Sequence, residues 1–450
     1  VYHLAETLGG WSMARLALAA FGDIDDLGDL PDIGGPEADD SGWGDDWGAG
    51  LPVVSDPETA KVGPHDPGKN PLSRGEWFRF LQFDQETKAI KPGLPSTEVI
   101  LTHDERLYGR IGYNTFTHSI VMMAAPGVLK KKARDGQTIG QLASTIWQHD
   151  KHNDVANGKA WEDPHSHAVR VMIESNPTRG GYGVKVTDRD LMAALVNVAM
   201  RSRFNPIVNS LEAGAWDGVP RAETLFIDYL GCDDDPYHRE AARLFLLGMV
   251  TRAYEPGHKF DFVPILLGLQ GKRKSTFSDI LGGPWKSDLA GDMQNNKEMI
   301  EQITGSWLSE IAELQAMTRS DAASVKAFVS RTVDKGRLPY DRLPKQFPRT
   351  CVFIGSTNDH TFLKDDTGNR RFWPIRCNLP EDVEIDTDRL LENREQILYE
   401  ATAIYRAMRR EQPHGTLPLY LRSEAARRIA AELQESHRGE TIEDMLAGEI

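Results

Sequence analysis

The feature that most constrains the fold is a series of short apolar runs in the second half of the chain. They read "DFVPILLG", "GSWLSEI", "RTCVFIGSTND" and "RRFWPIRCN", and segments with helical spacing separate them. A strand buried on both faces appears as a continuous apolar run rather than an alternating one. From about residue 260 the sequence therefore predicts an α/β fold with a mostly parallel sheet.

Four regions follow from composition and periodicity. Residues 1–69 are rich in Gly, Asp and Pro and are expected to form an acidic, mostly disordered linker. Residues 70–235 predict a mixed, mainly helical domain, which includes a helix capped by Thr187 or Asp188. Residues 236–380 hold the apolar runs, and residues 381–450 predict C-terminal helices with many exposed charges.

Net charge is −15, but it is unevenly spread. Residues 1–60 carry 13 acidic side chains and one basic side chain, which leaves only −3 for the other 390 residues. A local basic track that contacts nucleic acid is therefore compatible with the composition. Three widely spaced cysteines exclude a disulfide framework, and no apolar run has the roughly 18 residues of a membrane span. A cytoplasmic protein without a membrane partner is expected.

The stretch "GLQGKRKSTF" follows the first apolar run and nearly matches the phosphate-loop pattern G-x-x-x-x-G-K-[ST]. Phosphate binding needs converging backbone N–H groups, a cation for the β/γ-phosphates (Lys274) and a hydroxyl for Mg²⁺ (Ser275). The residues predicted to bind nucleotide are Gly268, Gly271, Lys274, Ser275 and Thr276.

Arg273 stands where the pattern has its second glycine. It fits a phosphate loop only if its backbone angles suit a residue with a Cβ and its side chain turns outward. It could also supply a second cation. The alternative is an ordinary basic turn between a strand and a helix.

Polar residues at the ends of the later runs support the nucleotide interpretation. Glu310 ends a strand expected beside the loop, where a carboxylate orients the Mg²⁺ shell and polarises the attacking water. Glu313 is the second candidate for this role. Thr357 and Asn358 end the next strand, where open α/β sheets bind ligands, and Asn358 is the candidate contact to the γ-phosphate or the water.

Arg370 and Arg371 begin the last run. Paired arginines can stabilise the transferring phosphoryl group from a neighbouring subunit, as arginine fingers do, or they can form salt bridges. The predicted catalytic residues are therefore Glu310, Asn358, Arg370 and Arg371, with Ser275 and Glu310 holding Mg²⁺.

In this order the motifs resemble the virulence-associated E proteins, which are primase-linked P-loop ATPases of phages, plasmids and genomic islands. These proteins are similar to superfamily 3 helicases within the AAA+ group. The resemblance covers about residues 95–380 and is most specific in "VKAFVSRTVDKGRLPY" and "RTCVFIGSTNDHTFLKDDTGNRRFWPI". The family usually has glycine at the position of Arg273.

The resemblance implies an AAA+-like ATPase that uses ATP and Mg²⁺ and acts on single-stranded DNA as a hexameric homo-oligomer, with a primase as a further partner. Asn358 resembles the polar sensor residue, and Arg370 or Arg371 resembles the arginine finger. Two alternatives stay open. One is a nucleotide-gated DNA- or protein-binding module with slow or no hydrolysis, and the other is a defence or regulatory ATPase without unwinding.

Seven basic residues and two acidic ones lie between Lys326 and Arg349. In the resembling helicases a hairpin here projects into the channel of a ring. Cations for phosphates and aromatic rings for base stacking are present in and beside "YDRLPKQF", although a solvated loop is the alternative. The predicted DNA contacts are Arg337, Tyr340, Arg342 and Lys345.

Overall fold

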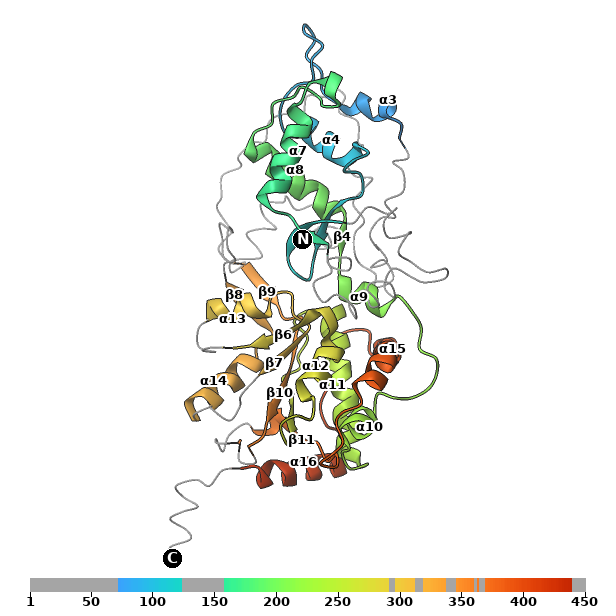
Figure 1. Cartoon of the computed structure of the whole chain (residues 1–450), viewed down its shortest axis with the longest axis vertical. Helices are drawn as coiled ribbons and strands as arrows, with labels where there is room; N and C mark the ends of the chain where they lie inside the picture. The colour runs from blue at the N-terminus through green and yellow to red at the C-terminus, as the bar shows by residue number, and fades with distance from the viewer. Residues whose placement is uncertain are drawn as a thin grey trace, which may run out of the picture. The chain divides into compact units, whose positions relative to one another are not determined.

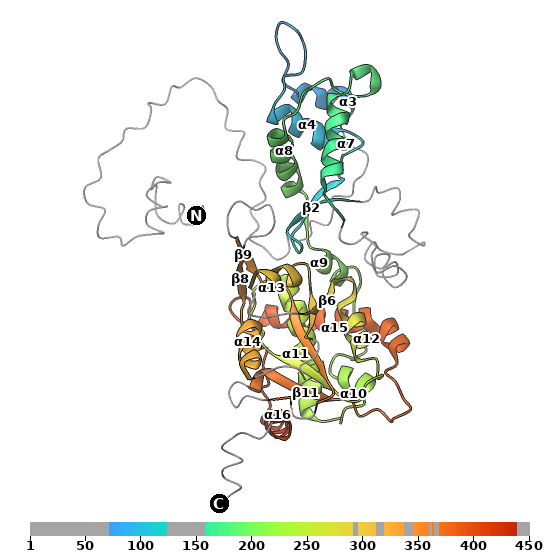
Figure 2. The same cartoon turned by 60° about the vertical axis from the view of Figure 1, so that its left-hand side comes forward.

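The protein is described by a computed structural model, shown in Figures 1 and 2. The described residues are 72–123, 158–290, 296–311, 319–336, 345–359, 362–363 and 369–438. Three of the four predicted DNA contacts, Arg337, Tyr340 and Arg342, lie outside these residues, as does Glu313.

The first described region combines a small mixed sheet with helices. Its helices are α3 (Arg74–Trp77), α4 (Leu94–His103), α7 (Asp163–Glu174) and α8 (Asp188–Arg201). Its strands, β1 (Ile111–Asn114), β2 (Ser119–Met122), β3 (Lys159–Ala160) and β4 (Arg203–Phe204), lie in the order β3-β2-β1-β4. The Thr187 hydroxyl accepts a hydrogen bond from the N–H of Asp190 at 3.1 Å, so Thr187 is the N-cap of α8.

A parallel five-stranded sheet organises the rest of the chain. Its strands are β5 (Val263–Leu267), β6 (Lys286–Leu289), β7 (Leu308–Ile311), β10 (Val352–Thr357) and β11 (Phe372–Arg376). They lie in the order β11-β5-β10-β7-β6, and every neighbouring pair is parallel. The prediction of an α/β fold with a mostly parallel sheet is confirmed. β10 lies between β5 and β7, so the strand that carries Glu310 is separated from the strand before the loop by one strand.

Helices cover both faces of this sheet (Figures 1 and 2). They are α9 (Pro206–Leu211), α10 (Leu225–Leu230), α11 (Pro236–Tyr254), α12 (Lys274–Gly282), α13 (Asn296–Ile303), α14 (Arg319–Val329), α15 (Thr387–Glu411) and α16 (Glu424–Ser436). A two-stranded antiparallel hairpin, β8 (Val333–Gly336) and β9 (Lys345–Pro348), lies outside the main sheet.

Strand β5 shows why its apolar run is continuous. Leu266 packs in one core with α11, α12 and the C-terminal helices, whereas Ile265 and Leu267 pack in a second core with α13 and α14. All five residues of β5 are buried. Alternate side chains point to opposite faces, so a sheet covered on both sides needs apolar residues at every position.

A buried arginine holds the strands that lead to the site. Arg252 on α11 donates to the carbonyls of His258 at 3.1 Å and Phe260 at 2.6 Å, and also to that of Cys351. Burial lowers its pKa to about 10, which leaves the guanidinium charged at neutral pH. Because Phe260 precedes β5 and Cys351 precedes β10, this one side chain fixes the two strands relative to each other.

Candidate functional site

The loop between β5 and α12 has the strand–loop–helix arrangement that a phosphate loop requires. Gly268 has φ 151° and Gly271 has φ 81°, both of which favour glycine. A Cβ added at Gly268 would also lie only 3.1 Å from the Cβ of Cys377, next to the end of β11. These two glycines are therefore required by the backbone and not merely by the motif.

Arg273 takes the left-handed conformation that the motif's glycine would take. Its φ is 62° and its ψ is 31°, a region that costs a residue with a side chain about 1–3 kcal/mol. Its guanidinium turns to Glu384, with Nε 2.5 Å from Oε2, and donates to the Thr387 hydroxyl at 3.3 Å. The loop thus accommodates arginine by straining the backbone and directing the side chain to the segment before α15.

Lys274 and Asn358 meet inside the loop. The Lys274 ammonium donates to Asn358 Oδ1 at 2.9 Å, to the Leu269 carbonyl at 3.0 Å and to the Gly268 carbonyl. Burial lowers the pKa of Lys274 below its usual value. Asn358 directly follows β10, and the two side chains therefore lie at the same edge of the sheet, where the sequence placed them.

Glu310 lies on the other side of Ser275. The Ser275 hydroxyl donates to Glu310 Oε1 at 3.2 Å, and the Glu310 side chain is only 4% exposed. The predicted pair of Mg²⁺ ligands is therefore adjacent. Both carboxylate oxygens already contact neighbouring groups. This suits the binding of a metal ion better than direct contact with the attacking water beside a γ-phosphate.

Three further side chains contact Glu310 and were not predicted. Ser356 on β10 donates to Oε1 at 2.9 Å, and Ser278 on α12 donates to Oε2 at 2.6 Å. The Lys286 ammonium, 8% exposed, lies 3.2 Å from Oε2. Ser278 lies one helical turn after Ser275, a spacing that could have revealed it. No local pattern marks Lys286 or Ser356, because their strands reach Glu310 only through sheet pairing.

Lys286 is paired with carboxylates on all sides. Its Nζ lies 3.0 Å from Asp279 Oδ1 and also contacts Asp288. Burial alone would lower its pKa, but the carboxylates of Asp288, Glu310 and Asp279 together raise the pKa of Lys286 above its usual value. A permanently charged ammonium therefore balances this acidic cluster.

These groups surround an open cavity of about 710 Å³ at the carboxyl ends of β5, β7 and β10. Its lining comprises Leu269, Gln270, Gly271, Lys272, Arg273, Lys274, Ser275, Thr276, Asp288, Glu310, Ser356, Thr357 and Asn358. All five residues predicted to bind nucleotide belong to the loop and the first turn of α12. The site thus combines a cation, several hydroxyls and a carboxylate around a space large enough for a small ligand.

The arginine pair lies elsewhere. Arg370 and Arg371 precede β11, whose first residue, Phe372, pairs with Val263 at the start of β5. The loop starts at Gly268, which directly follows β5 and lies five residues after Val263. About 16 Å of strand therefore separates the pair from the loop in the same chain. Arg371 donates to the Ser330 hydroxyl at 2.8 Å, whereas Arg370 is exposed.

The hairpin predicted between the Glu310 and Asn358 strands is present as β8 and β9. Lys345, the one predicted DNA contact that is described, is exposed at the start of β9. Arg349 at its base is fully buried and pairs with Asp334 at 2.6 Å. Lys326 is also buried and donates to Asn369 at 3.0 Å. These two members of the basic track are therefore engaged within the fold and do not face a ligand.

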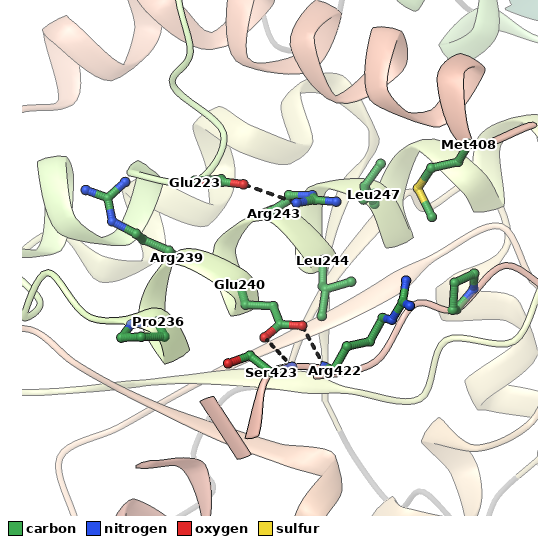
Figure 3. Close-up of a pocket in the computed structure, with 11 residues that line it drawn as sticks. Glu223, Pro236, Arg239, Glu240, Arg243, Leu244, Leu247, Met408, Arg422 and Ser423 are labelled. Carbon is green, nitrogen blue, oxygen red and sulfur yellow. Dashed lines mark hydrogen bonds and ion pairs between the residues drawn. The ribbon is translucent and has the colours of Figure 1, made fainter. Parts of the chain in front are cut away.

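A second cavity, of about 410 Å³, lies between α11 and the start of α16 (Figure 3). Glu240 accepts from the backbone N–H groups of Arg422 at 2.6 Å and Ser423 at 3.3 Å, and Arg243 pairs with Glu223 at 3.2 Å. Glu240 thus fastens the C-terminal segment to α11, and Arg243 fastens the segment before α10.

Comparison with known proteins assigns the family. A family model described as "Virulence-associated protein E-like domain" matches residues 209–439, just over half of the 450 residues. The chain belongs to this family. The matched range contains the loop between β5 and α12, every described residue that contacts Glu310, the arginine pair and the hairpin. The resemblance read from the sequence is thereby confirmed.

Solved structures give weaker likenesses to this virulence-associated protein E-like chain. "The apo structure of NrS-1 C terminal region (305-718)" matches at 16% identity with a TM-score of 0.36, covering 53% of this chain and 56% of that one. A second form, "The A form apo structure of NrS-1 C terminal region-CTR(305-718)", matches at 15% identity and 0.34, covering 53% and 55%. The chain thus spans about half the length of these relatives. No curated protein matches it. Among the described residues, no helix has the length and apolarity to cross a membrane.

Proposed function

We propose that this chain is a Mg²⁺-dependent ATPase of the P-loop, AAA+-like type. It couples ATP hydrolysis to binding and unwinding of single-stranded DNA in the replication of a phage or mobile element, as a homo-oligomeric ring. A primase is the further partner that the family resemblance implies.

One observation carries the proposal. Lys274, Ser275, Glu310 and Asn358 come from three different elements and converge on one cavity at the carboxyl edge of a parallel sheet. Lys274 lies at the first position of α12, so the helix N-terminus adds its own attraction for an anion. A basic turn without a ligand would not need a carboxylate, an amide and a hydroxyl arranged around it.

The Ser275 and Glu310 oxygens fit a magnesium ion. They are 3.2 Å apart, close to the roughly 2.9 Å that separates adjacent ligands of an octahedral ion with bonds of about 2.0–2.1 Å. A hydroxyl and a carboxylate are also the oxygen ligands that this hard cation prefers. When bound, Mg²⁺ would be held by Ser275 and Glu310 and would neutralise negative charge that develops on the phosphates.

The protein's own residues bind and orient the nucleotide. The loop N–H groups hold the phosphates, and Lys274 exchanges its contacts with the Gly268 and Leu269 carbonyls for phosphate oxygens. Asn358, released from Lys274, is placed to hydrogen-bond the γ-phosphate or the attacking water. Glu310 would hold the Mg²⁺ together with Ser275 and would help to orient the attacking water for in-line attack.

The position of the arginines favours a ring. Neither Arg370 nor Arg371 reaches the loop of its own chain, so this pair could act as an arginine finger only on the loop of a neighbouring subunit. Arg370 is the better candidate since it is exposed, whereas Arg371 is tied to Ser330 and Asp261. Assembly would then complete the site, as a heterologous ring interface allows.

The experiment measures ATP turnover with and without single-stranded DNA for the wild type and for Lys274→Ala. Lys297→Ala serves as the matched control, since that lysine is 75% exposed on α13 and is not among the residues that line the cavity. We expect turnover that DNA stimulates, that Lys274→Ala loses and that Lys297→Ala keeps.

The other outcomes separate the alternatives. ATP binding without measurable turnover would favour a nucleotide-gated module, and turnover indifferent to DNA would favour a regulatory or defence ATPase. Size measured with and without nucleotide tests the ring, because a protein that stays monomeric at saturating ATP cannot supply an arginine in trans.

A further inference from the structure

The phosphate loop carries a second buried lysine that points away from the cavity centre. Lys272 is 6% exposed, and its ammonium donates to the carbonyls of Pro380 at 2.5 Å, Glu381 at 2.7 Å and Val383 at 2.8 Å. An ammonium has three N–H donors, and three carbonyls take them all. Lys272 is thus fully engaged by the chain between β11 and α15 and has no donor left for a phosphate.

The next residue reaches the same segment. Arg273 pairs with Glu384 and donates to Thr387, the first residue of α15. Both partners of the ion pair are 52% exposed, so this contact contributes less than the buried contacts of Lys272. Two successive loop residues therefore hold residues 380–387.

The far end of the loop's helix is held by the same part of the chain. Arg394 on α15 is 3% exposed and donates to the carbonyl of Ile280 at 2.6 Å and to that of Leu281 at 3.2 Å, in the last turn of α12. A Cβ at Gly283 would meet the Arg394 guanidinium at 2.6 Å, so the helix end is shaped around it. Residues 380–387 and α15 therefore contact the loop before α12 and the last turn of α12.

From these contacts we propose that Lys272 is a positioning residue of the nucleotide site, which fixes the phosphate loop on residues 380–387 and links nucleotide occupancy to that segment. The proposal rests on the function proposed above. A loop that binds phosphate through backbone N–H groups binds tightly only when those groups are already arranged, because ordering them on binding costs affinity. The Lys272 ammonium has no donor left for a phosphate, so this side chain acts on nucleotide affinity rather than on the chemical step.

The test compares the wild-type chain with Lys272→Met, using a fluorescent ADP analogue for the dissociation constant and ATP turnover for kcat. Methionine keeps most of the side-chain volume and leaves the three carbonyls without their donor. We expect the dissociation constant to rise about tenfold for both ADP and ATP, with kcat at saturation within about twofold of wild type. Lys272→Arg restores a charged donor and should recover most of the affinity.

Hydrogen exchange provides the second measurement. Saturating ADP should slow exchange in residues 380–387 of the wild type, and this protection should be weaker in Lys272→Met. If Lys272→Met does not fold, the absence of any ADP effect on residues 380–387 in the wild type would still overturn the proposal.

The results distinguish this proposal from the one on which it rests. A wild type that binds no nucleotide overturns both. Wild-type binding that Lys274→Ala abolishes and Lys272→Met leaves unchanged overturns only the positioning role. An unchanged dissociation constant with a large fall in kcat would also overturn it, because Lys272 would then act on the chemical step.

Discussion

Removing the carboxylate of Asp334 is expected to destabilise the base of the β8–β9 hairpin strongly. Asp334 and Arg349 have side chains that are 1% and 0% exposed. Arg349 donates to the two Asp334 oxygens at 2.6 Å and 3.0 Å, and its guanidinium carbon lies 4.2 Å from the centre of the Phe328 ring. This guanidinium has no solvent to replace a lost partner.

The magnitude follows from that burial. Asp334→Ala leaves an uncompensated buried charge, which costs about 3–5 kcal/mol of the free energy of unfolding. In a unit of about 200 residues that corresponds to a fall in Tm of roughly 6–20 °C. Arg331→Ala is the matched control, because Arg331 Nη1 lies 3.7 Å from the same carboxylate on a side chain that is 36% exposed. Its expected cost is at most about 1 kcal/mol.

Urea and thermal unfolding of the wild type, Asp334→Ala and Arg331→Ala measure these losses of stability. Combining Asp334→Leu with Arg349→Met removes both charges and should cost less than Asp334→Ala alone. The reasoning is refuted if Asp334→Ala is no less stable than Arg331→Ala. It is also refuted if the double variant is the least stable, because the loss would then come from packing and not from the unpaired charge.

Three further predictions concern pH and the arginine pair. Burial lowers the pKa of His258 below 6.5, and the neutral ring accepts the Leu417 N–H at Nε2 at 2.9 Å. The free energy of unfolding should therefore fall as pH drops below about 6.5, which urea midpoints at pH 7.5 and 5.5 measure. His258→Gln should lose this part of the pH dependence. Burial raises the pKa of Glu400 above 4.5, so its contribution to the free energy of unfolding should fall as pH rises through that raised pKa. At pH 7 the free energy of unfolding of Glu400→Gln should be no more than about 1 kcal/mol below that of the wild type, or should exceed it. Arg370→Ala should lower turnover about 10³-fold while nucleotide binding is kept, whereas Arg371→Ala should mainly lower Tm.

Each of these predictions has a contradicting result. Identical pH profiles for the wild type and His258→Gln would remove the histidine from the explanation. A marked loss of stability in Glu400→Gln at pH 7 would mean that the negative charge itself stabilises the fold. Full turnover in Arg370→Ala would exclude that residue as the finger.

The order of strands and loops along the chain could be predicted because each has a local sequence pattern. Continuous apolar runs predicted the parallel sheet, and a polar residue after each run predicted the edge at which Lys274, Glu310 and Asn358 gather. The hairpin was anticipated from the family resemblance, and Lys345, a predicted DNA contact, lies exposed on it. The assignment of nucleotide, metal and DNA to these residues stays a prediction.

Cations were the hardest group to assign from sequence. Lys272, Arg273 and Lys274 are adjacent and chemically alike, yet one contacts carbonyls of the segment before α15, one an exposed glutamate and one the interior of the loop. Arg349 belonged to a track of basic residues that looked uniform, but it is buried in an ion pair. A charge count contains no information on where each side chain points.

By itself, the sequence determined the α/β class, the strand–loop–helix element and the family, because these depend on local periodicity and on short motifs. The tertiary structure decided that β10 separates β5 from β7, that Lys286 and Ser356 join Glu310, and that the arginine pair lies far from its own loop. It also decided that arginine can stand at the motif's glycine position, since the left-handed backbone at Arg273 is held by contacts with Glu384 and Thr387. These outcomes depend on pairings between residues distant in sequence, which no local pattern encodes.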